Sequence, residues 1–80
     1  MLSSLMTEAW NQASQGRDRE IVKSMLETAL MAARGVAKRH RQTVDAADLK
    51  NSIKMLFMVP SVGVSDNIAT KIADAIVSEQ

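Results

Sequence analysis

The sequence predicts an all-α protein made of a short helix, a long helix, a second short helix and a fourth helix near the C-terminus. Apolar residues recur at steps of three and four along four successive stretches. Residues that cap or break helices separate these stretches, and no convincing strand appears beyond a residue or two at Thr43-Val44. We therefore expect one domain, with a helical core over residues 1–59 and an added helix within residues 60–80.

The first two helices are predicted by their apolar faces and by the residues at their ends. Ser3 or Ser4 can cap the first helix, and Gly16 can end it in the left-handed conformation. Asp18 can cap the second helix, which continues without a proline to His40. The apolar positions are Leu2, Leu5, Met6, Ala9, Trp10 and Ala13 in the first helix, and Ile21, Val22, Met25, Leu26, Ala29, Leu30, Ala33, Val36 and Ala37 in the second.

The third and fourth helices begin with clear start signals. Asp45 is a good N-cap for the third helix, and Asp48 lies in its first turn, where a carboxylate favours the helix dipole. Pro60 breaks the chain after this helix, and Ser65 or Asp66 can cap the fourth. The apolar positions are Leu49, Ile53, Leu56 and Phe57 in the third helix, and Ile68, Ala69, Ile72, Ala73 and Ile76 in the fourth.

The length and the composition limit how the domain can be stabilised. Eighty residues bury only a little over ~60% of the surface that the unfolded chain exposes, so domains of this size usually add a disulfide, a metal or a partner chain. The chain has no cysteine and its single histidine is His40, which leaves no disulfide and no tetrahedral metal site. We expect no metal and no cofactor, so a partner chain is the remaining source of stability.

The sequence also lacks the patterns of an enzyme. None of its three glycines belongs to a phosphate-binding loop, and His40 has no evident nucleophile to activate. Asp45 and Asp48 would make a carboxylate pair, but helix capping explains both of them. We therefore expect a non-enzymatic protein.

Charge and hydropathy bear on where the protein acts. The longest apolar run, residues 55–59, is far shorter than a membrane span, and residues 1–15 do not have the pattern of a signal peptide. The absence of cysteine fits a reducing compartment, so we expect an intracellular, soluble protein with no membrane partner. The net charge of +1 is too small to require a nucleic-acid partner.

The most distinctive stretch is KRHRQTVDAADLK, residues 38–50. Arg41 lies at the end of the long helix, and Asp48 follows seven residues later in the first turn of the next helix. If Thr43-Val44 forms a short extended turn, Asp48 can face back towards Arg41. A bidentate contact between them would fix the angle between the two helices.

These residues resemble the histone fold, which has a long central helix, a loop of the form Arg-x-Thr-Val/Ile and a third helix with Asp in its first turn. Arg41, Thr43, Val44 and Asp48 occupy the matching positions, followed by Leu49, and the resemblance covers residues 1–58. It implies an obligate homo- or hetero-dimer in which two central helices cross head to tail and the paired loops contact the DNA backbone.

The same stretch is also similar to the small helical lid domain of AAA-type ATPases, where a basic turn precedes Val-x-x-x-Asp. The segment ALMAARG, residues 29–35, would fit such a lid. The nucleotide-binding half is missing from this sequence. This second resemblance therefore implies a free-standing adaptor or a fragment.

The apolar stripe of the long helix runs for about five turns, which is more than two short neighbouring helices are expected to cover. We therefore predict a dimer interface in the middle of this helix. An alternative is that the fourth helix folds back over the stripe in a compact monomer. The predicted interface residues are Met25, Leu26, Ala29, Leu30 and Ala33.

Two functions from different classes are consistent with these observations. The first is a DNA-backbone-binding dimer, or a scaffold in a DNA-associated complex, although the same cations at a helix end also suit the helix dipole without any ligand. The second is a protein–protein interaction module, such as a viral or plasmid-type adaptor or inhibitor, for which the six methionines provide adaptable contacts. The predicted DNA contacts are Lys38, Arg39 and Arg41 beside His40, with Arg17, Arg19 and Lys23 as a second cationic site.

Overall fold

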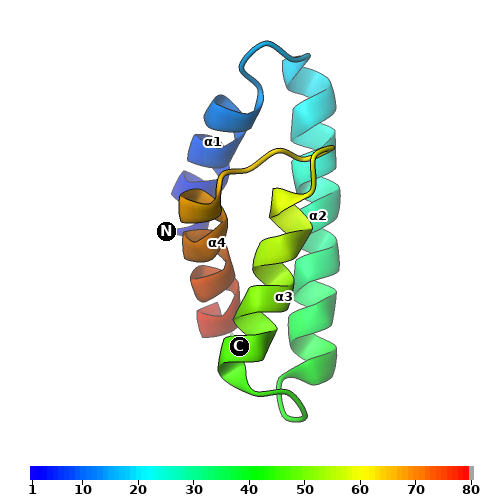
Figure 1. The fold of residues 1–80 in the computed structure, drawn as a ribbon, viewed down its shortest axis with the longest axis vertical. Helices are drawn as coiled ribbons and strands as arrows, with labels where there is room; N and C mark the ends of the chain where they lie inside the picture. Colours follow the sequence, from blue (N-terminus) through cyan, green and yellow to red (C-terminus); the bar gives the residue numbers. More distant parts are fainter. Residues whose placement is uncertain (80) are drawn as a thin grey trace.

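Each of the four apolar stretches forms one helix in the computed structural model, which describes residues 1–79. The helices are α1 (Leu2–Ala13), α2 (Arg19–His40), α3 (Ala46–Met58) and α4 (Asp66–Glu79), and no strand occurs among these residues. They lie side by side in an elongated bundle of 39 × 19 × 17 Å (Figure 1). The predicted all-α class and the predicted order of helix lengths are confirmed.

The helix starts follow the predicted caps only in part. The Asp18 carboxylate accepts hydrogen bonds from the backbone N–H groups of Glu20 (2.9 Å) and Ile21 (3.2 Å), so it caps α2 as predicted. Asp45 occupies the N-cap position of α3 without a side-chain capping bond. The prediction for α1 is wrong, because the helix already begins at Leu2, whose side chain packs against the core, and both candidate serines lie inside it.

The loops between the helices are tight. Gly16, after α1, and Gly63, between α3 and α4, have φ angles of 74° and 78°, in the region that favours glycine. Thr43 and Val44 both donate their backbone N–H groups to the carbonyl of His40, at 3.1 and 3.0 Å. The expected residue or two of strand at Thr43-Val44 is therefore a hydrogen-bonded turn that continues directly from the end of α2.

One hydrophobic core joins all four helices. Phe57, Ile53, Ile72 and Ile76 are its largest fully buried side chains together with Val22, so α3 and α4 supply most of its centre. The loop between α3 and α4 adds two buried valines. Figure 1 shows α4 lying beside α1 and α3, which places residues 60–79 within the same core as the first three helices.

The apolar stripe of α2 is largely covered by its own chain. Leu26, Ala29 and Ala33 retain 2%, 8% and 0% of their exposure, and Met25 and Leu30 are half-buried. Much of the buried face of α2 is alanine, so neighbouring helices can pack close to it. The expectation that this stripe is too broad for its own chain is therefore not met for the three buried residues of the predicted interface.

Candidate interaction surfaces

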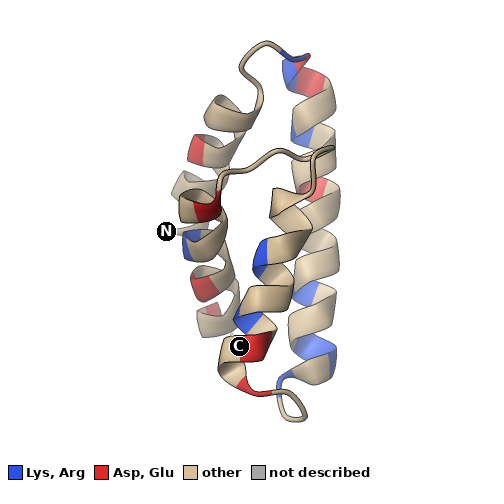
Figure 2. Ribbon diagram, viewed as in Figure 1, with Lys and Arg blue, Asp and Glu red and all other residues tan. Residues whose placement is uncertain are grey.

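The cationic residues predicted to bind DNA form two groups at opposite ends of α2. Arg17, Arg19 and Lys23 lie at the start of this helix, whereas Lys38 and Arg39 lie at its end (Figure 2). A helix of this length is about 33 Å long at 1.5 Å per residue. The structure therefore does not bring the six predicted residues together in one site.

The Arg17 guanidinium binds the protein itself. Its Nη1 donates hydrogen bonds to the carbonyls of Val62 (2.9 Å) and Ala13 (3.3 Å), and its Nη2 donates to the carbonyl of Ser61. A Cβ atom at Gly63 would lie 2.8 Å from Nη1, so a side chain there would displace the guanidinium from this contact. Arg17 thus joins the end of α1 to the loop between α3 and α4 through both of its Nη groups.

Arg19 and Lys23 surround Trp10 of α1. The Cζ atom of Arg19 lies 4.0 Å from the centroid of the Trp10 ring, and the Nζ atom of Lys23 lies 5.6 Å from it. Arg19 also donates hydrogen bonds to Ser14 Oγ (3.1 Å) and Asn11 Oδ1 (2.9 Å), while Trp10 Nε1 donates to the Arg19 carbonyl (2.7 Å). This predicted cationic site therefore fastens α1 to the start of α2.

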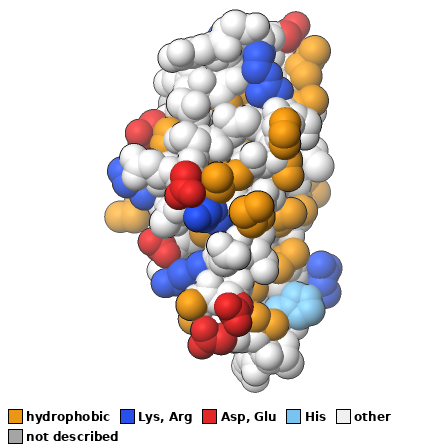
Figure 3. Space-filling model, in the orientation of Figure 1, with side chains coloured by type: hydrophobic (Ala, Val, Ile, Leu, Met, Phe, Trp, Pro, Cys, Tyr) orange, Lys and Arg blue, Asp and Glu red, His pale blue; other side chains and the backbone are white. Residues whose placement is uncertain are grey.

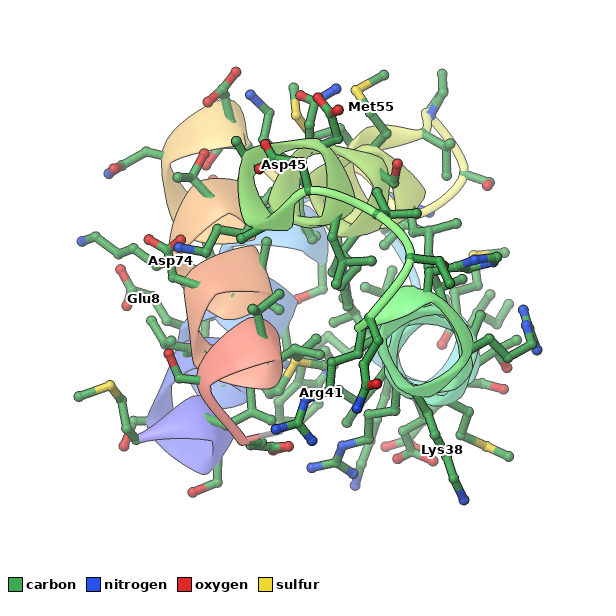
Figure 4. All side chains as sticks on the ribbon, turned by 90° about the horizontal axis from the view of Figure 1, so that it is seen from below. Glu8, Lys38, Arg41, Asp45, Met55 and Asp74 are labelled. Carbon is green, nitrogen blue, oxygen red and sulfur yellow. The ribbon has the colours of Figure 1, made fainter. Side chains whose placement is uncertain are left out.

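The cations at the end of α2 make fewer contacts within the protein than Arg17 and Arg19 do. Lys38, Arg39 and Arg41 are exposed, and Lys38 points away from the bundle (Figure 4). A Cβ atom at Gly35 would lie 3.6 Å from Arg39 Nη1, so that guanidinium lies back over the preceding turn. The ion pairs among residues 1–79 involve other cations and join Arg34 to Glu79, Lys50 to Asp74 and Lys54 to Asp66.

The predicted ion pair between Arg41 and Asp48 is absent from residues 1–79. Both side chains are exposed, and the tight turn after His40 takes the place of the extended connection that would have aimed them at each other. Figure 4 shows Arg41 and Asp45 at the two ends of this loop. Near this loop, Leu49 is buried in the core and Val44 packs against it.

An apolar surface remains exposed along α2, next to α3. We call it the α2–α3 face, and it consists of Ile21, Met25, Thr28, Ala32 and Gly35 of α2 with Leu56 of α3. Ile21 is 54% exposed. A groove of ≈ 310 Å³ lies on this face, between the first half of α2, the end of α3 and the following loop. Figure 3 shows hydrophobic side chains gathered on this side of the molecule.

This face could have been predicted from the sequence. The helical period predicts one stripe that contains Ile21 and Met25 together with Leu26 and Ala33. However, residues 21, 25, 28, 32 and 35 follow alternate steps of four and three, which defines a second seam with a period of 3.5. That spacing was the available signal.

A larger groove of ≈ 770 Å³ runs between the start of α1 and the end of α4. Leu2, Leu5 and Ala75 form its apolar part, and Met1, 93% exposed, forms its edge. Two acids on its rim, Asp74 and Glu79, are engaged in ion pairs with α3 and α2. Lys71 also lines the groove, and it makes no ion pair among the described residues.

The described residues were also searched for metal ligands and for helices that could span a membrane. Within residues 1–79, no three side chains of histidine, cysteine, aspartate or glutamate come together as metal ligands. None of the described helices has both the length and the apolarity needed to cross a bilayer.

Comparison of the chain with protein-family models, with curated proteins and with solved structures finds no match. The resemblances to the histone fold and to the AAA-type lid therefore stay predictions.

Proposed function

We propose that this chain is a non-enzymatic protein-interaction module that binds another polypeptide through the α2–α3 face. The observation that carries the proposal is the exposed apolar seam on α2 beside a groove of ≈ 310 Å³. Full burial of an exposed isoleucine contributes roughly 1.5–3 kcal/mol, and Ile21, at 54% exposure, would gain about half of this when covered. A partner that covers this face would supply the stabilisation that an 80-residue chain lacks.

The adaptability of the surface supports the same function. Met25 lines the groove and is half-buried in the single chain. Methionine side chains repack easily against irregular surfaces, which suits a docking site. The charge balance of +1 and the internal contacts of Arg17 and Arg19 leave less cationic surface for nucleic acid than the sequence predicted.

Photo-crosslinking tests this function. A photoreactive phenylalanine analogue in place of Ala32, in the middle of the face, is expected to form a protein adduct in the cells that make the chain. The matched control carries the same analogue in place of Ala47, an exposed helical alanine in the first turn of α3. Absence of an adduct from position 32, or equal adducts from both positions, contradicts the proposal.

A second candidate function is contact with the DNA backbone at the end of α2. It is favoured by the exposure of Lys38, Arg39 and Arg41, which have no acidic partner within residues 1–79. Phosphate contacts by these three cations would give shape-based rather than base-specific binding, as the histone-fold resemblance implies.

An electrophoretic mobility shift with duplex DNA at low salt tests this candidate. With three phosphate contacts, the logarithm of the affinity should fall with the logarithm of salt with a slope of about −3. Reversing Lys38 and Arg39 to glutamate should abolish the shift, whereas Lys71→Glu, at an exposed position of α4, should change it little. If the low-salt shift is absent, or persists in the double variant, the end of α2 is not a DNA contact.

A further inference from the structure

We propose that Met25 is an oxidation site, and that its sulfoxide prevents docking on the α2–α3 face while the chain stays folded. This inference rests on the proposed function and adds the regulation of the same face. The oxidant is a peroxide. It acts on the free chain, because a partner that covers the α2–α3 face also covers Met25.

The Met25 sulfur is accessible in the free chain. Met25 is half-buried and lines the groove of ≈ 310 Å³ on the α2–α3 face. A water molecule takes up about 30 Å³ in the liquid, so this groove has room for hydrogen peroxide, which has only one more oxygen atom. The oxidant can therefore reach Met25 without unfolding of the chain.

A charged donor lies beside this sulfur. Arg17 Nη2 donates a hydrogen bond to Met25 Sδ at 3.8 Å, and no other sulfur accepts a hydrogen bond within residues 1–79. A thioether sulfur is a weak acceptor. A sulfoxide oxygen is a much stronger acceptor, because it carries most of the negative charge of the S–O bond. Arg17 therefore favours the oxidised side chain over the reduced one at this position.

The Arg17 guanidinium can bind the new oxygen and keep its existing contacts. Its Nη1 donates to the carbonyls of Val62 and Ala13, and its Nη2 donates to the carbonyl of Ser61. Each Nη atom carries two N–H groups, so Nη2 has one left for the Met25 side chain. The sulfoxide oxygen gains a charge-assisted hydrogen bond, which offsets the cost of placing a polar group at a half-buried position. We therefore expect the oxidised chain to stay folded.

The reaction is a two-electron oxidation of the thioether. A lone pair of Sδ attacks one oxygen of hydrogen peroxide, the O–O bond breaks, and hydroxide leaves. The hydroxide takes the proton from the new S–OH group, which yields the sulfoxide and one molecule of water. Methionine sulfoxide reductases reverse the change with electrons from thiols. The site can therefore be switched in both directions.

Oxidation changes the surface that a partner meets. Met25 lies between Ile21 and Thr28 on the seam of α2, and Leu56 lines the groove beside it. The sulfoxide is polar and chiral, and a partner that covers the face must remove water from the new oxygen. Met31, in contrast, is 74% exposed and lies outside the α2–α3 face, so its oxidation should not affect docking.

Urea unfolding tests the contact between Arg17 and the oxygen. Met25→Gln places an uncharged oxygen acceptor at this position, as the sulfoxide does, and should leave the urea midpoint close to that of the wild-type chain. The same substitution in an Arg17→Ala chain should lower the midpoint clearly, because the oxygen then has no charged donor. Arg17→Gln, which keeps an N–H donor but not the charge, is the background to use if Arg17→Ala does not unfold cooperatively. Equal shifts in the two backgrounds overturn the role of Arg17.

Photo-crosslinking of the oxidised chain tests the switch. The purified chain with the photoreactive analogue at position 32 is treated with hydrogen peroxide, freed of it, mixed with an extract of the cells that make the chain and irradiated. Oxidation should lower the adduct yield several-fold, and the reductases should restore it. A Met25→Leu chain should keep its adduct after the same treatment, whereas Met31→Leu, the matched control, should lose it as the wild-type chain does. Peptide mass spectrometry verifies that Met25 carries the oxygen.

The two proposals can fail separately. An adduct that persists when Met25 is fully oxidised overturns the switch and leaves the interaction module standing. Loss of the adduct from the oxidised Met25→Leu chain, or an oxidised wild-type chain that circular dichroism shows to be unfolded, overturns the switch as well. If position 32 of the untreated chain forms no adduct, the interaction module fails, and the switch fails with it because there is no docking to prevent.

Discussion

At the level of single residues, the cations of this protein differ in what their donors contact. Arg17 binds backbone carbonyls of α1 and of the loop between α3 and α4, and Arg19 stacks on Trp10. Arg41 makes no ion pair within residues 1–79. Arginines that look alike in the sequence therefore have two roles in the structure. Arg17 and Arg19 hold elements together, whereas Arg41 is available to a ligand.

Arg17→Ala should destabilise the protein by about 2 kcal/mol. The variant leaves the carbonyls of Val62 and Ala13 without a charged donor, and such hydrogen bonds contribute roughly 1.5–3 kcal/mol. Urea unfolding followed by circular dichroism measures the change. Arg41→Ala is the matched control and should alter the free energy of unfolding by less than about 0.5 kcal/mol. Equal effects of the two variants would contradict the structural role of Arg17.

At the level of helices, α4 is held in place by burial. Ile72 and Ile76 are fully buried against the rest of the core. The ion pairs that join α4 and its start to α2 and α3 lie at the surface, and the side chains of Lys50 and Asp74 are 43% and 55% exposed. Exposed pairs of this kind contribute roughly 0–1 kcal/mol, so they orient α4 more than they stabilise it.

Ile72→Ala should therefore lower the free energy of unfolding by about 2–5 kcal/mol, which is the range for truncating a buried isoleucine. Asp74→Asn breaks an exposed ion pair on the same helix and should change it by at most about 1 kcal/mol. Urea unfolding of both variants compares the two effects. An Asp74→Asn effect as large as that of Ile72→Ala would show that the surface pairs hold α4.

At the level of the whole molecule, the core is one cluster that needs all four helices. Five of its buried residues come from α4, and two more come from the loop before it. The histone-fold resemblance, in contrast, covers residues 1–58 and implies a three-helix core that is completed by a partner chain. These two descriptions differ in what a shortened chain should do.

A chain of residues 1–59 should not unfold cooperatively. Without α4, the buried side chains of Ile53 and Phe57 lose their partners, and a domain this small has little stability in reserve. Thermal unfolding by circular dichroism, compared with the full chain, measures this. Cooperative unfolding of a shortened chain that sediments as a dimer would instead support the histone-fold-like core.

Local patterns in the sequence were sufficient to predict the four helices and several of the residues at which they begin or end. The four apolar stretches, the Asp18 cap and the left-handed Gly16 depend on residues within a few positions of each other. These features could therefore be predicted from the sequence. The start of α1 and the turn at Thr43-Val44 were predicted wrongly, because packing of Leu2 and bonds to His40 outweighed the local capping and turn signals.

The packing of the helices against one another determined the candidate sites. The partners of Arg17 at Ser61 and Val62 lie 44 and 45 residues away in the sequence, beyond the reach of any local pattern. The period of α2 is compatible with two apolar seams, and only the positions of α1, α3 and α4 show that Leu26 is buried while Ile21 is exposed. Sequence periodicity records where a helix is apolar, whereas burial depends on which neighbours arrive from distant parts of the chain.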